Sequence, residues 1–223
     1  MILKNKIVSA NFTGHSYITE SDRSSGLRVN ASSASEGTVV DVAGTLSTVD
    51  GERAITSASV AVVSSRSAPL PLGVVGRDLG GGASGLQPGV LNGFGLNNIG
   101  LLVTVWGHVN QIGDGHLYID DGSALRDGTL TGAEENIGVR VICDPTDYHA
   151  GDYLIVTGIS SCFETPSGLA RPADTRAPDG GRAASLAAMT RGHGDPINHL
   201  TIDHGPLTIN HSIIWFQANA CLV

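Results

Sequence analysis

The chain has few aromatic and basic residues, and it has no long hydrophobic run. Aromatic residues make up 4% of the 223 residues, and Lys and Arg together number 13 against 21 Asp and Glu. The formal net charge of −8 repels phosphate backbones, so nucleic acid is disfavoured as a partner. No apolar run approaches the roughly 18 residues that a membrane-spanning helix needs, and we therefore expect no membrane partner.

Cysteine is also scarce. The three residues are Cys143, Cys162 and Cys221, and an odd number is not a disulfide framework. Cys143 and Cys162 lie at the ends of neighbouring expected strands. They either form a disulfide, which would fit an oxidising compartment, or serve as two small buried hydrophobic residues. The segment Met1–Lys6 has no apolar core of a signal peptide and leads directly into an expected strand. This start suggests a fragment of a longer protein, or a mature domain cut from its leader.

The chain is rich in glycine, with 30 residues. It also contains a sequence pattern that repeats after about a hundred residues. The first copy reads HSYI at 15–18, GLRV at 26–29 and GTVVDVAG at 37–44, and the second reads HLYI at 116–119, GVRV at 138–141 and GDYLIVTG at 151–158. The offset grows from 101 to 112 to 114. One fold used twice, with extra loop residues in the second copy, explains this pattern.

Short β-branched runs separated by Gly and Asp turns predict an all-β protein. The expected strands are 6–10, 16–20, 27–29, 38–46 and 53–63 in the first copy, and 101–109, 116–120, 139–143, 153–159 and 169–172 in the second. Asp50-Gly51 is a hairpin turn signal. We expect two tandem five-stranded barrels at 1–65 and 101–178, a docked Gly/Pro-rich linker at 66–100 and a His-rich C-terminal extension at 179–223.

Several segments resemble bacterial tandem OB-fold-like modules of secreted glycoside-hydrolase-like and surface proteins. The segments are WGHV at 106–109, YIDDGS at 118–123, GVRV at 138–141, VTGI at 156–159 and the linker GFGLNNIGLL at 93–102. The resemblance covers about residues 1–178. It implies OB-like barrels, an extracytoplasmic location and a binding or accessory role without assigned activity. The OB binding face would place Trp106, Tyr118, Asp120 and Arg140 at the ligand in the second copy.

The acidic loop at 120–128 is the strongest candidate for chemistry. Closely spaced carboxylates among Gly and Ser suit Ca²⁺, with Asp120, Asp121 and Asp127 as ligands, whereas the ordinary alternative is a hairpin turn. If the chain is an enzyme, a small hydrolase of an ester, lactone or glycosidic bond is the class with support. Asp120, Asp121, His108 and His116 would then be its catalytic residues, assisted by the metal.

Two further sets of side chains leave alternatives open. His193, His199, His204 and His211 lie within 19 residues, either as a metal-binding tract or as a solvated tail. Trp106, Tyr118, Tyr148 and Tyr153 either fill barrel interiors or stack on a ligand, and with a negative net charge they fit carbohydrate better than nucleic acid. The favoured function is therefore a non-catalytic module that binds a polysaccharide, a small molecule or a neighbouring protein domain, and the hydrolase is the alternative.

Overall fold

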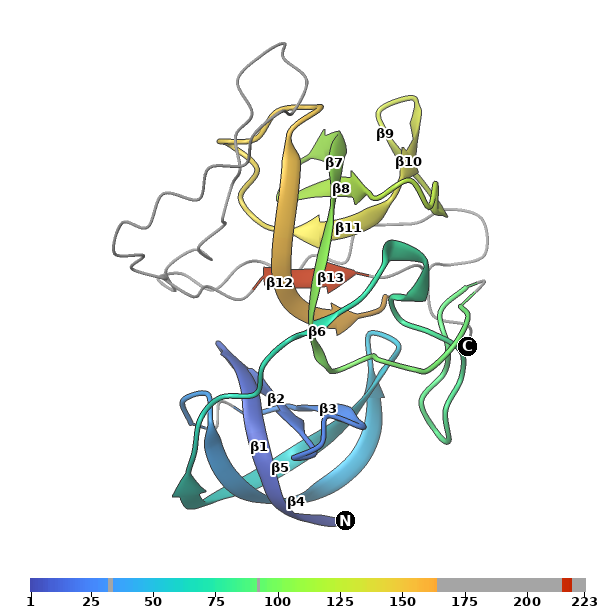
Figure 1. The fold of residues 1–223 in the computed structure, drawn as a ribbon. Helices are drawn as coiled ribbons and strands as arrows, with labels where there is room; N and C mark the ends of the chain where they lie inside the picture. The colour runs from blue at the N-terminus through green and yellow to red at the C-terminus, as the bar shows by residue number, and fades with distance from the viewer. Residues whose placement is uncertain (32–33, 92, 164–213, 218–223) are drawn as a thin grey trace, which may run out of the picture.

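The computed structural model describes residues 1–31, 34–91 and 93–163, and the backbone of 214–217. These residues form strands and one short 3-10 turn, η1 (Gly76–Asp78), and they contain no α-helix. The predicted all-β class is confirmed. Two β units lie one above the other, the first at the bottom of Figure 1 and the second at the top. No helix among the described residues is long and apolar enough to span a membrane.

The first half is a closed five-stranded barrel. Its strands are β1 (Ile2–Phe12), β2 (His15–Thr19), β3 (Gly26–Val29), β4 (Thr38–Val49) and β5 (Glu52–Ser65). They pair in the order β1-β2-β3-β5-β4, and β4 closes the ring on β1. Every pairing is antiparallel except β3 with β5. The five predicted strands of the first copy are confirmed, with longer ends for β1, β4 and β5.

Alternation along these strands fills the barrel. Val8, Ile18, Val29, Val40 and Ile55 point inward and are at most 1% exposed. The long β4–β5 pair turns through Asp50 and Gly51, whose φ angles of 53° and 84° are the positive values of a tight hairpin turn. The predicted Asp-Gly hairpin is therefore confirmed. Register shifts within β4–β5 bend the pair, which helps the sheet to close.

The second half is built on β7 (Leu102–Gly113), β8 (His116–Asp120), β11 (Val139–Ile142) and β12 (Tyr153–Ser161), which match four predicted strands. The sheet runs β12-β13-β11-β8-β7-β6, with the short β6 (Leu72–Gly73) at its edge, and β12 also pairs with β7. Strand β13 (Ile214–Gln217) lies between β11 and β12, parallel to β12. The fifth strand expected at 169–172 lies outside the described residues.

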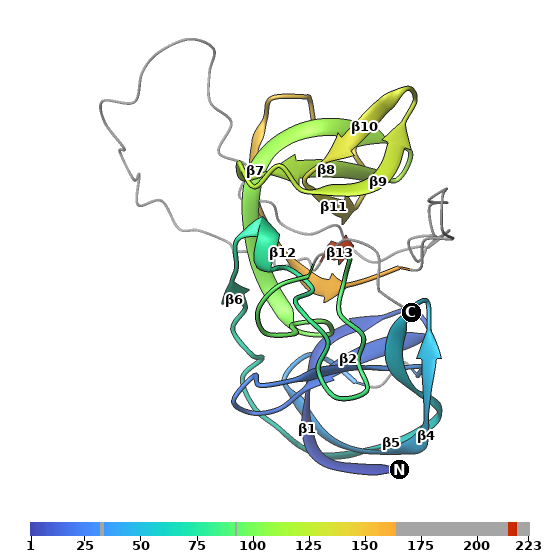
Figure 2. The same cartoon turned by 90° about the vertical axis from the view of Figure 1, so that its right-hand side faces the viewer.

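A hairpin that was expected only as loop residues is inserted in the second half. Strands β9 (Arg126–Thr131) and β10 (Glu134–Ile137) form this two-stranded sheet of their own. The hairpin lies between β8 and β11, the place where the offset between the two copies grows from 101 to 112. Figure 2 shows it beside β8, on the outside of the second half. The extra residues of the second copy therefore form a structural element, the β9–β10 hairpin.

The two halves are joined by direct packing. Ala10 and Tyr17 of the first barrel form one buried cluster with Ile159 of β12, and Leu102 packs against it. The backbones also touch, since a Cβ atom added at Gly26 would clash with the carbonyl group of Gly100. Leu79, Val90 and Ile99, from the segment between the halves, are buried in the core of the second half.

The two cysteines of the described chain differ. Cys143 is a free thiol, so the alternative disulfide between Cys143 and Cys162 is not formed. Burial raises the pKa of the Cys143 thiol to about 12, and the nearby Asp144 carboxylate acts in the same direction. Cys143 is therefore an unreactive, partly buried thiol at neutral pH. Cys162 is disulfide-bonded.

Candidate functional site

The residues predicted to bind or react fall in three different places. Trp106 and His108 lie on the exposed outer side of β7. Tyr118 and Arg140 lie opposite each other on β8 and β11 and are 1% and 4% exposed. Asp120 ends β8 and Asp121 follows it. The structure does not bring Trp106, Tyr118 and Arg140 together on one open face, as the OB-like binding face required.

Tyr118 is covered from outside by the inserted hairpin, whereas Arg140 packs against Phe163. The Tyr118 hydroxyl donates to Oδ2 of Asp127 at 2.7 Å, and it lies 2.9 Å from Oγ1 of Thr129. The Arg140 guanidinium stacks over the Phe163 ring, 5.5 Å from its centroid. Burial raises the pKa of Tyr118, and the neighbouring Asp127 carboxylate adds to the rise. Asp127 is thus a buried partner of Tyr118, whereas the calcium hypothesis required it as an open ligand.

The first barrel repeats this cluster. Tyr17 is paired with Arg28 across β2 and β3, as Tyr118 is with Arg140, and its hydroxyl donates to Oε2 of Glu52 at 2.7 Å. Burial raises the pKa of Glu52, although the Ser161 and Tyr17 hydroxyls lower it in part. Here β12 of the second half covers the face, through Ile159. The outer face of β2 and β3 is therefore covered by another part of the same chain. The equivalent face of β8 and β11 in the second copy is covered likewise.

The acidic loop is held by hydrogen bonds from its own backbone and from the linker. Oδ1 of Asp121 accepts from the Ser123 backbone N–H at 3.0 Å and from the Ser123 hydroxyl, and Oδ2 accepts from the Gly76 N–H at 2.7 Å. Asp120 accepts from the Ala124 N–H at 2.9 Å. Burial opposes ionisation of Asp121, but these hydrogen bonds together outweigh it and lower the pKa. This is the bonding of a turn, with Asp121 also anchoring the linker.

Of the remaining catalytic candidates, the structure makes His108 and Asp120 cross-strand neighbours and keeps His116 apart from His108. His108 is opposite Asp120 in the β7–β8 pairing, whereas His116 is opposite Gly113 at the other end of β8. Four residues along a strand span about 13 Å, so the two imidazoles do not meet. Within the described residues there is no group of three or more His, Cys, Asp or Glu side chains that could hold a metal ion. The hydrolase and its Ca²⁺ stay predictions. His193, His199, His204 and His211 lie outside the described residues.

Among the described residues of the second half, the outer side of β7 and β12 is an open surface. Three cross-strand pairs follow one another there, Thr104 with Thr157, Trp106 with Ile155 and His108 with Tyr153. We call these six residues the β7–β12 ladder. Trp106, Tyr153 and Ile155 are 37%, 40% and 42% exposed, which is high for large apolar side chains that neighbour one another.

The side chains of the ladder contact one another in pairs. Oγ1 of Thr104 lies 2.7 Å from Oγ1 of Thr157, so the two hydroxyls are hydrogen-bonded. The His108 and Tyr153 rings meet edge to face, with centroids 4.9 Å apart, which fixes the orientation of the tyrosine ring. No Asp, Glu, Lys or Arg occupies a ladder position. Trp106 and Tyr153 were among the aromatic candidates of the sequence, but which of the four would be exposed depended on the strand faces. Ile155 gave no functional signal.

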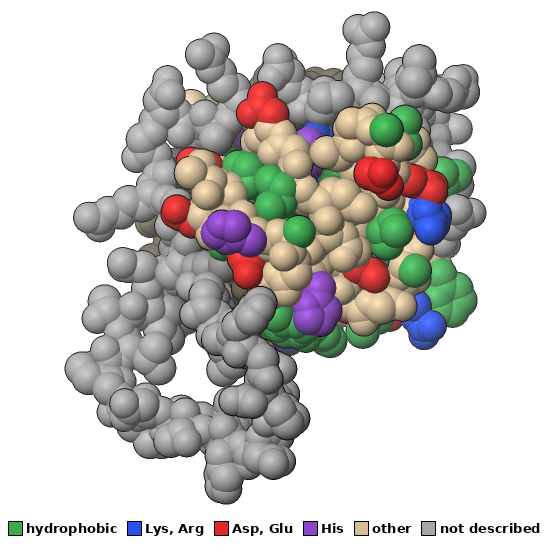
Figure 3. Space-filling model, turned by 90° about the horizontal axis from the view of Figure 1, so that it is seen from above, with side chains coloured by type: hydrophobic (Ala, Val, Ile, Leu, Met, Phe, Trp, Pro, Cys, Tyr) green, Lys and Arg blue, Asp and Glu red, His purple; other side chains and the backbone are tan. Residues whose placement is uncertain are grey.

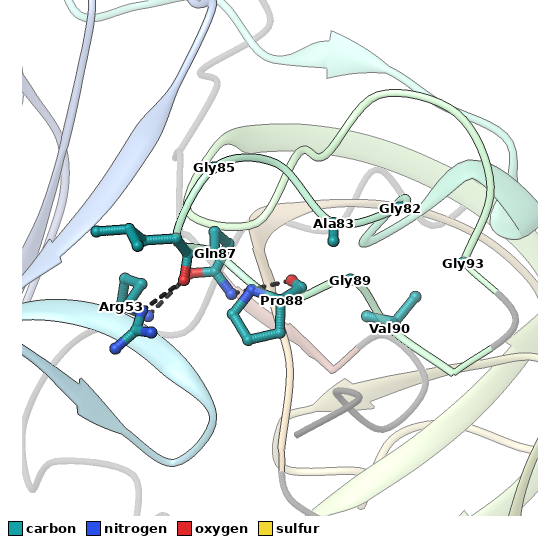
Figure 4. Close-up of a pocket in the computed structure, with 10 residues that line it drawn as sticks. Arg53, Gly82, Ala83, Gly85, Gln87, Pro88, Gly89, Val90 and Gly93 are labelled. Atoms are coloured by element: carbon teal, nitrogen blue, oxygen red, sulfur yellow. Dashed lines mark hydrogen bonds between the residues drawn. The ribbon is translucent and has the colours of Figure 1, made fainter.

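Two shallow hollows lie elsewhere. One, of about 360 Å³, lies between the first barrel and the linker and is shown in Figure 4. Arg53 lines it, but its Nε donates to the Leu86 carbonyl and its Nη1 to the Thr48 hydroxyl at 2.6 Å. The other hollow contains Arg23 and Arg66. Figure 3 shows acidic side chains scattered over the top of the second half, with basic atoms mainly near one edge. The described side chains of this face form no basic stripe for nucleic acid.

Comparison with known proteins adds no relative. No protein-family description matches the chain, and neither a curated protein nor a solved structure matches it. We therefore infer the function from the geometry of this molecule.

Proposed function

We propose that the chain is a non-catalytic binding module whose ligand surface is the β7–β12 ladder, and that the ligand is an uncharged polysaccharide. The proposal rests on two neighbouring cross-strand pairs, Trp106 with Ile155 and His108 with Tyr153, which are exposed on a regular strand surface. Sugar rings have apolar C–H faces edged by hydroxyl groups. A row of aromatic and aliphatic side chains that ends in a pair of threonine hydroxyls offers groups for both features.

The charge distribution favours this ligand over the alternatives. Single-stranded nucleic acid needs aromatic platforms inside a positive groove, whereas this chain has a net charge of −8 and a ladder without Lys or Arg. A stable protein partner usually covers a larger apolar area than three exposed side chains provide. A neutral chain of sugars needs only a narrow stacking track along the strands, which the ladder supplies.

We further propose that both halves are OB-like barrels of an extracytoplasmic protein. In the first half, the order β1-β2-β3-β5-β4 with a parallel β3–β5 pair supports this. In the second half, the β12–β7 pairing and the place of β13 beside β11 support a corresponding ring. The disulfide at Cys162 supports an oxidising compartment. The faces that OB folds commonly use are covered in both copies, which moves the ligand to the β7–β12 side.

Affinity electrophoresis tests the proposal. Native gels containing cellulose derivatives, xylan, β-glucan, starch or soluble chitin derivatives would be run with the wild type, Trp106→Ala and Tyr153→Ala. We expect at least one neutral polymer to retard the wild type. Trp106→Ala should bind about tenfold more weakly, which corresponds to about 1.4 kcal/mol. Phe94→Ala is the matched control, because Phe94 is an aromatic residue 69% exposed outside the ladder.

Two results would contradict the proposal. One is retention that Trp106→Ala and Tyr153→Ala leave unchanged, and the other is no retention by any neutral polymer. Turnover of an ester, lactone or glycoside that is lost in Asp121→Ala would instead support the hydrolase alternative.

A further inference from the structure

The second hollow lies on the first barrel, away from the β7–β12 ladder. It has a volume of about 410 Å³ and forms where the β2–β3 turn faces the end of β5 and the chain that follows. Arg23 and Ser21 line it from the turn. Arg66, Ser67 and Leu70 line it from the segment after β5.

The two arginines of this hollow have no carboxylate partner among the residues that the structure describes. Nη1 of Arg23 donates to the Leu70 carbonyl at 3.1 Å, which leaves its Nε and Nη2 unassigned. The Arg66 side chain makes no hydrogen bond or ion pair with any described residue, and its backbone N–H bonds to the Gly37 carbonyl. By contrast, Arg28, Arg77 and Arg126 all contact Asp or Glu. Arg23 and Arg66 therefore place two guanidinium groups, without a carboxylate partner among the described residues, in one hollow of an acidic chain.

The neighbouring carboxylates are already engaged. Glu20 pairs with Lys6 at 2.5 Å, and Oδ1 of Asp22 accepts from the Ser24 N–H at 3.0 Å. The backbone of Arg23 is held at φ 61°, a left-handed conformation that costs a non-glycine residue about 1 kcal/mol. The Arg23 N–H bonds to the Glu20 carbonyl at 3.0 Å, which helps to keep the turn in this conformation. Strain at the residue that presents a guanidinium to a hollow is typical of a binding position.

We propose that this hollow binds one oxyanion group, a carboxylate, sulfate or phosphate carried by a small ligand or a sugar unit. The Arg23 and Arg66 guanidinium groups supply planar sets of donors that match such oxygens. The Ser21 and Ser67 hydroxyls, which make no hydrogen bond within the described chain, add two neutral donors. Pro69 and Leu70, which is 76% exposed, form an apolar wall for the carbon part of the ligand.

Titrations followed by NMR test this site. ¹⁵N-labelled full-length protein in low-salt buffer would receive inorganic phosphate, inorganic sulfate, glucuronate or glucose, with the arginine Nε–Hε signals recorded. We expect saturable shifts of the Arg23 and Arg66 signals with at least one of the three anions and none with glucose. The anion that binds most tightly distinguishes a tetrahedral from a planar preference.

Arg66→Ala is the decisive variant, because its side chain holds no other group in place. We expect it to weaken anion binding at least tenfold, and Arg66→Lys to restore only part of the affinity. Arg77→Ala, which removes another exposed arginine, should bind as the wild type does. Saturable binding by none of the anions, or equal affinity in Arg66→Ala, would overturn the proposal. Retention of Arg66→Ala on neutral polysaccharide should be unchanged, so this site and the ladder fail or succeed separately.

Discussion

At the scale of single residues, the repeat preserves a buried tyrosine opposite an arginine. What differs between the copies is the carboxylate that accepts the hydrogen bond of the tyrosine hydroxyl. Tyr17 donates to Glu52 on β5 of its own barrel, whereas Tyr118 donates to Asp127 on the inserted hairpin. A tyrosine hydroxyl buried without an acceptor costs about 1–3 kcal/mol, so each copy must retain some acceptor. The sequence repeat indicated that these residues have the same role in both copies. It did not indicate that both tyrosines are buried by other parts of the chain.

His15 predicts a specific dependence of stability on acid. Burial lowers its pKa from 6.5 to about 4, and the Arg28 charge acts in the same direction. Between pH 6.5 and 4, the unfolded chain therefore binds a proton at this residue that the folded chain does not, and stability is lost as the pH falls through this window. In His15→Gln this loss should be smaller by about 1–2 kcal/mol, a value reduced for partial exposure.

Urea unfolding of both proteins at several pH values measures this difference. His149→Gln is the control, because His149 is exposed, and its curve should parallel that of the wild type. A His15→Gln curve that also parallels the wild type would show that His15 titrates normally in the folded protein.

At the scale of elements, local sequence predicts the strands well. It predicts poorly which parts of the chain pack over their faces. The alternation of apolar residues and the Asp50-Gly51 turn were enough for all five strands of the first barrel, because each is settled by neighbours along the chain. The β9–β10 hairpin was missed, since its residues lie in a loop-like run of Gly, Thr and Glu. Its burial of Tyr118 arises from contacts across the sheet, which the local sequence does not show.

Asp127 connects this hairpin to the barrel. Its Oδ1 accepts from the Thr129 N–H and hydroxyl, and its Oδ2 accepts from Tyr118. Asp127→Ala should destabilise the protein by about 2–3 kcal/mol, because it leaves these buried donors unpaired. Leu130→Ala lies on the same hairpin, 61% exposed, and should change stability by less than about 0.5 kcal/mol.

Thermal and urea unfolding of both variants would check this. Equal stability of Asp127→Ala and Leu130→Ala would mean that the hairpin does not depend on the Tyr118 contact.

At the scale of the whole molecule, the two copies form one packed unit. The repeat predicted two similar halves, but a sequence pattern contains no information on how two copies face each other. The structure places β12 of the second half on the outer face of the first barrel, around Tyr17 and Ile159. With that face and the hairpin-covered face both occupied, the β7–β12 ladder contains the largest apolar side chains that are still exposed on the described strands β7, β8, β11 and β12.

The contact between Gly26 and Gly100 tests this packing. Gly26→Ala would place a methyl group against the Gly100 carbonyl, and the two halves would have to separate or shift. We expect a loss of about 1–3 kcal/mol, or more if the halves come apart. Gly73→Ala is the control, because a Cβ atom there meets nothing within 4 Å. Calorimetry should show one unfolding transition for the wild type and Gly73→Ala. An undiminished melting temperature in Gly26→Ala would contradict the packing of the halves.

The central claim, that the β7–β12 ladder is the ligand surface, is tested most directly by an NMR footprint. ¹⁵N-labelled protein would be titrated with an oligosaccharide from the neutral polymer that retards it most. We expect saturable shift changes concentrated at 104–108 on β7 and 153–157 on β12, with the Trp106 indole signal among the largest. Changes concentrated instead at the Asp120–Ser123 turn, around Tyr118 and Arg140, or in the first barrel would contradict it.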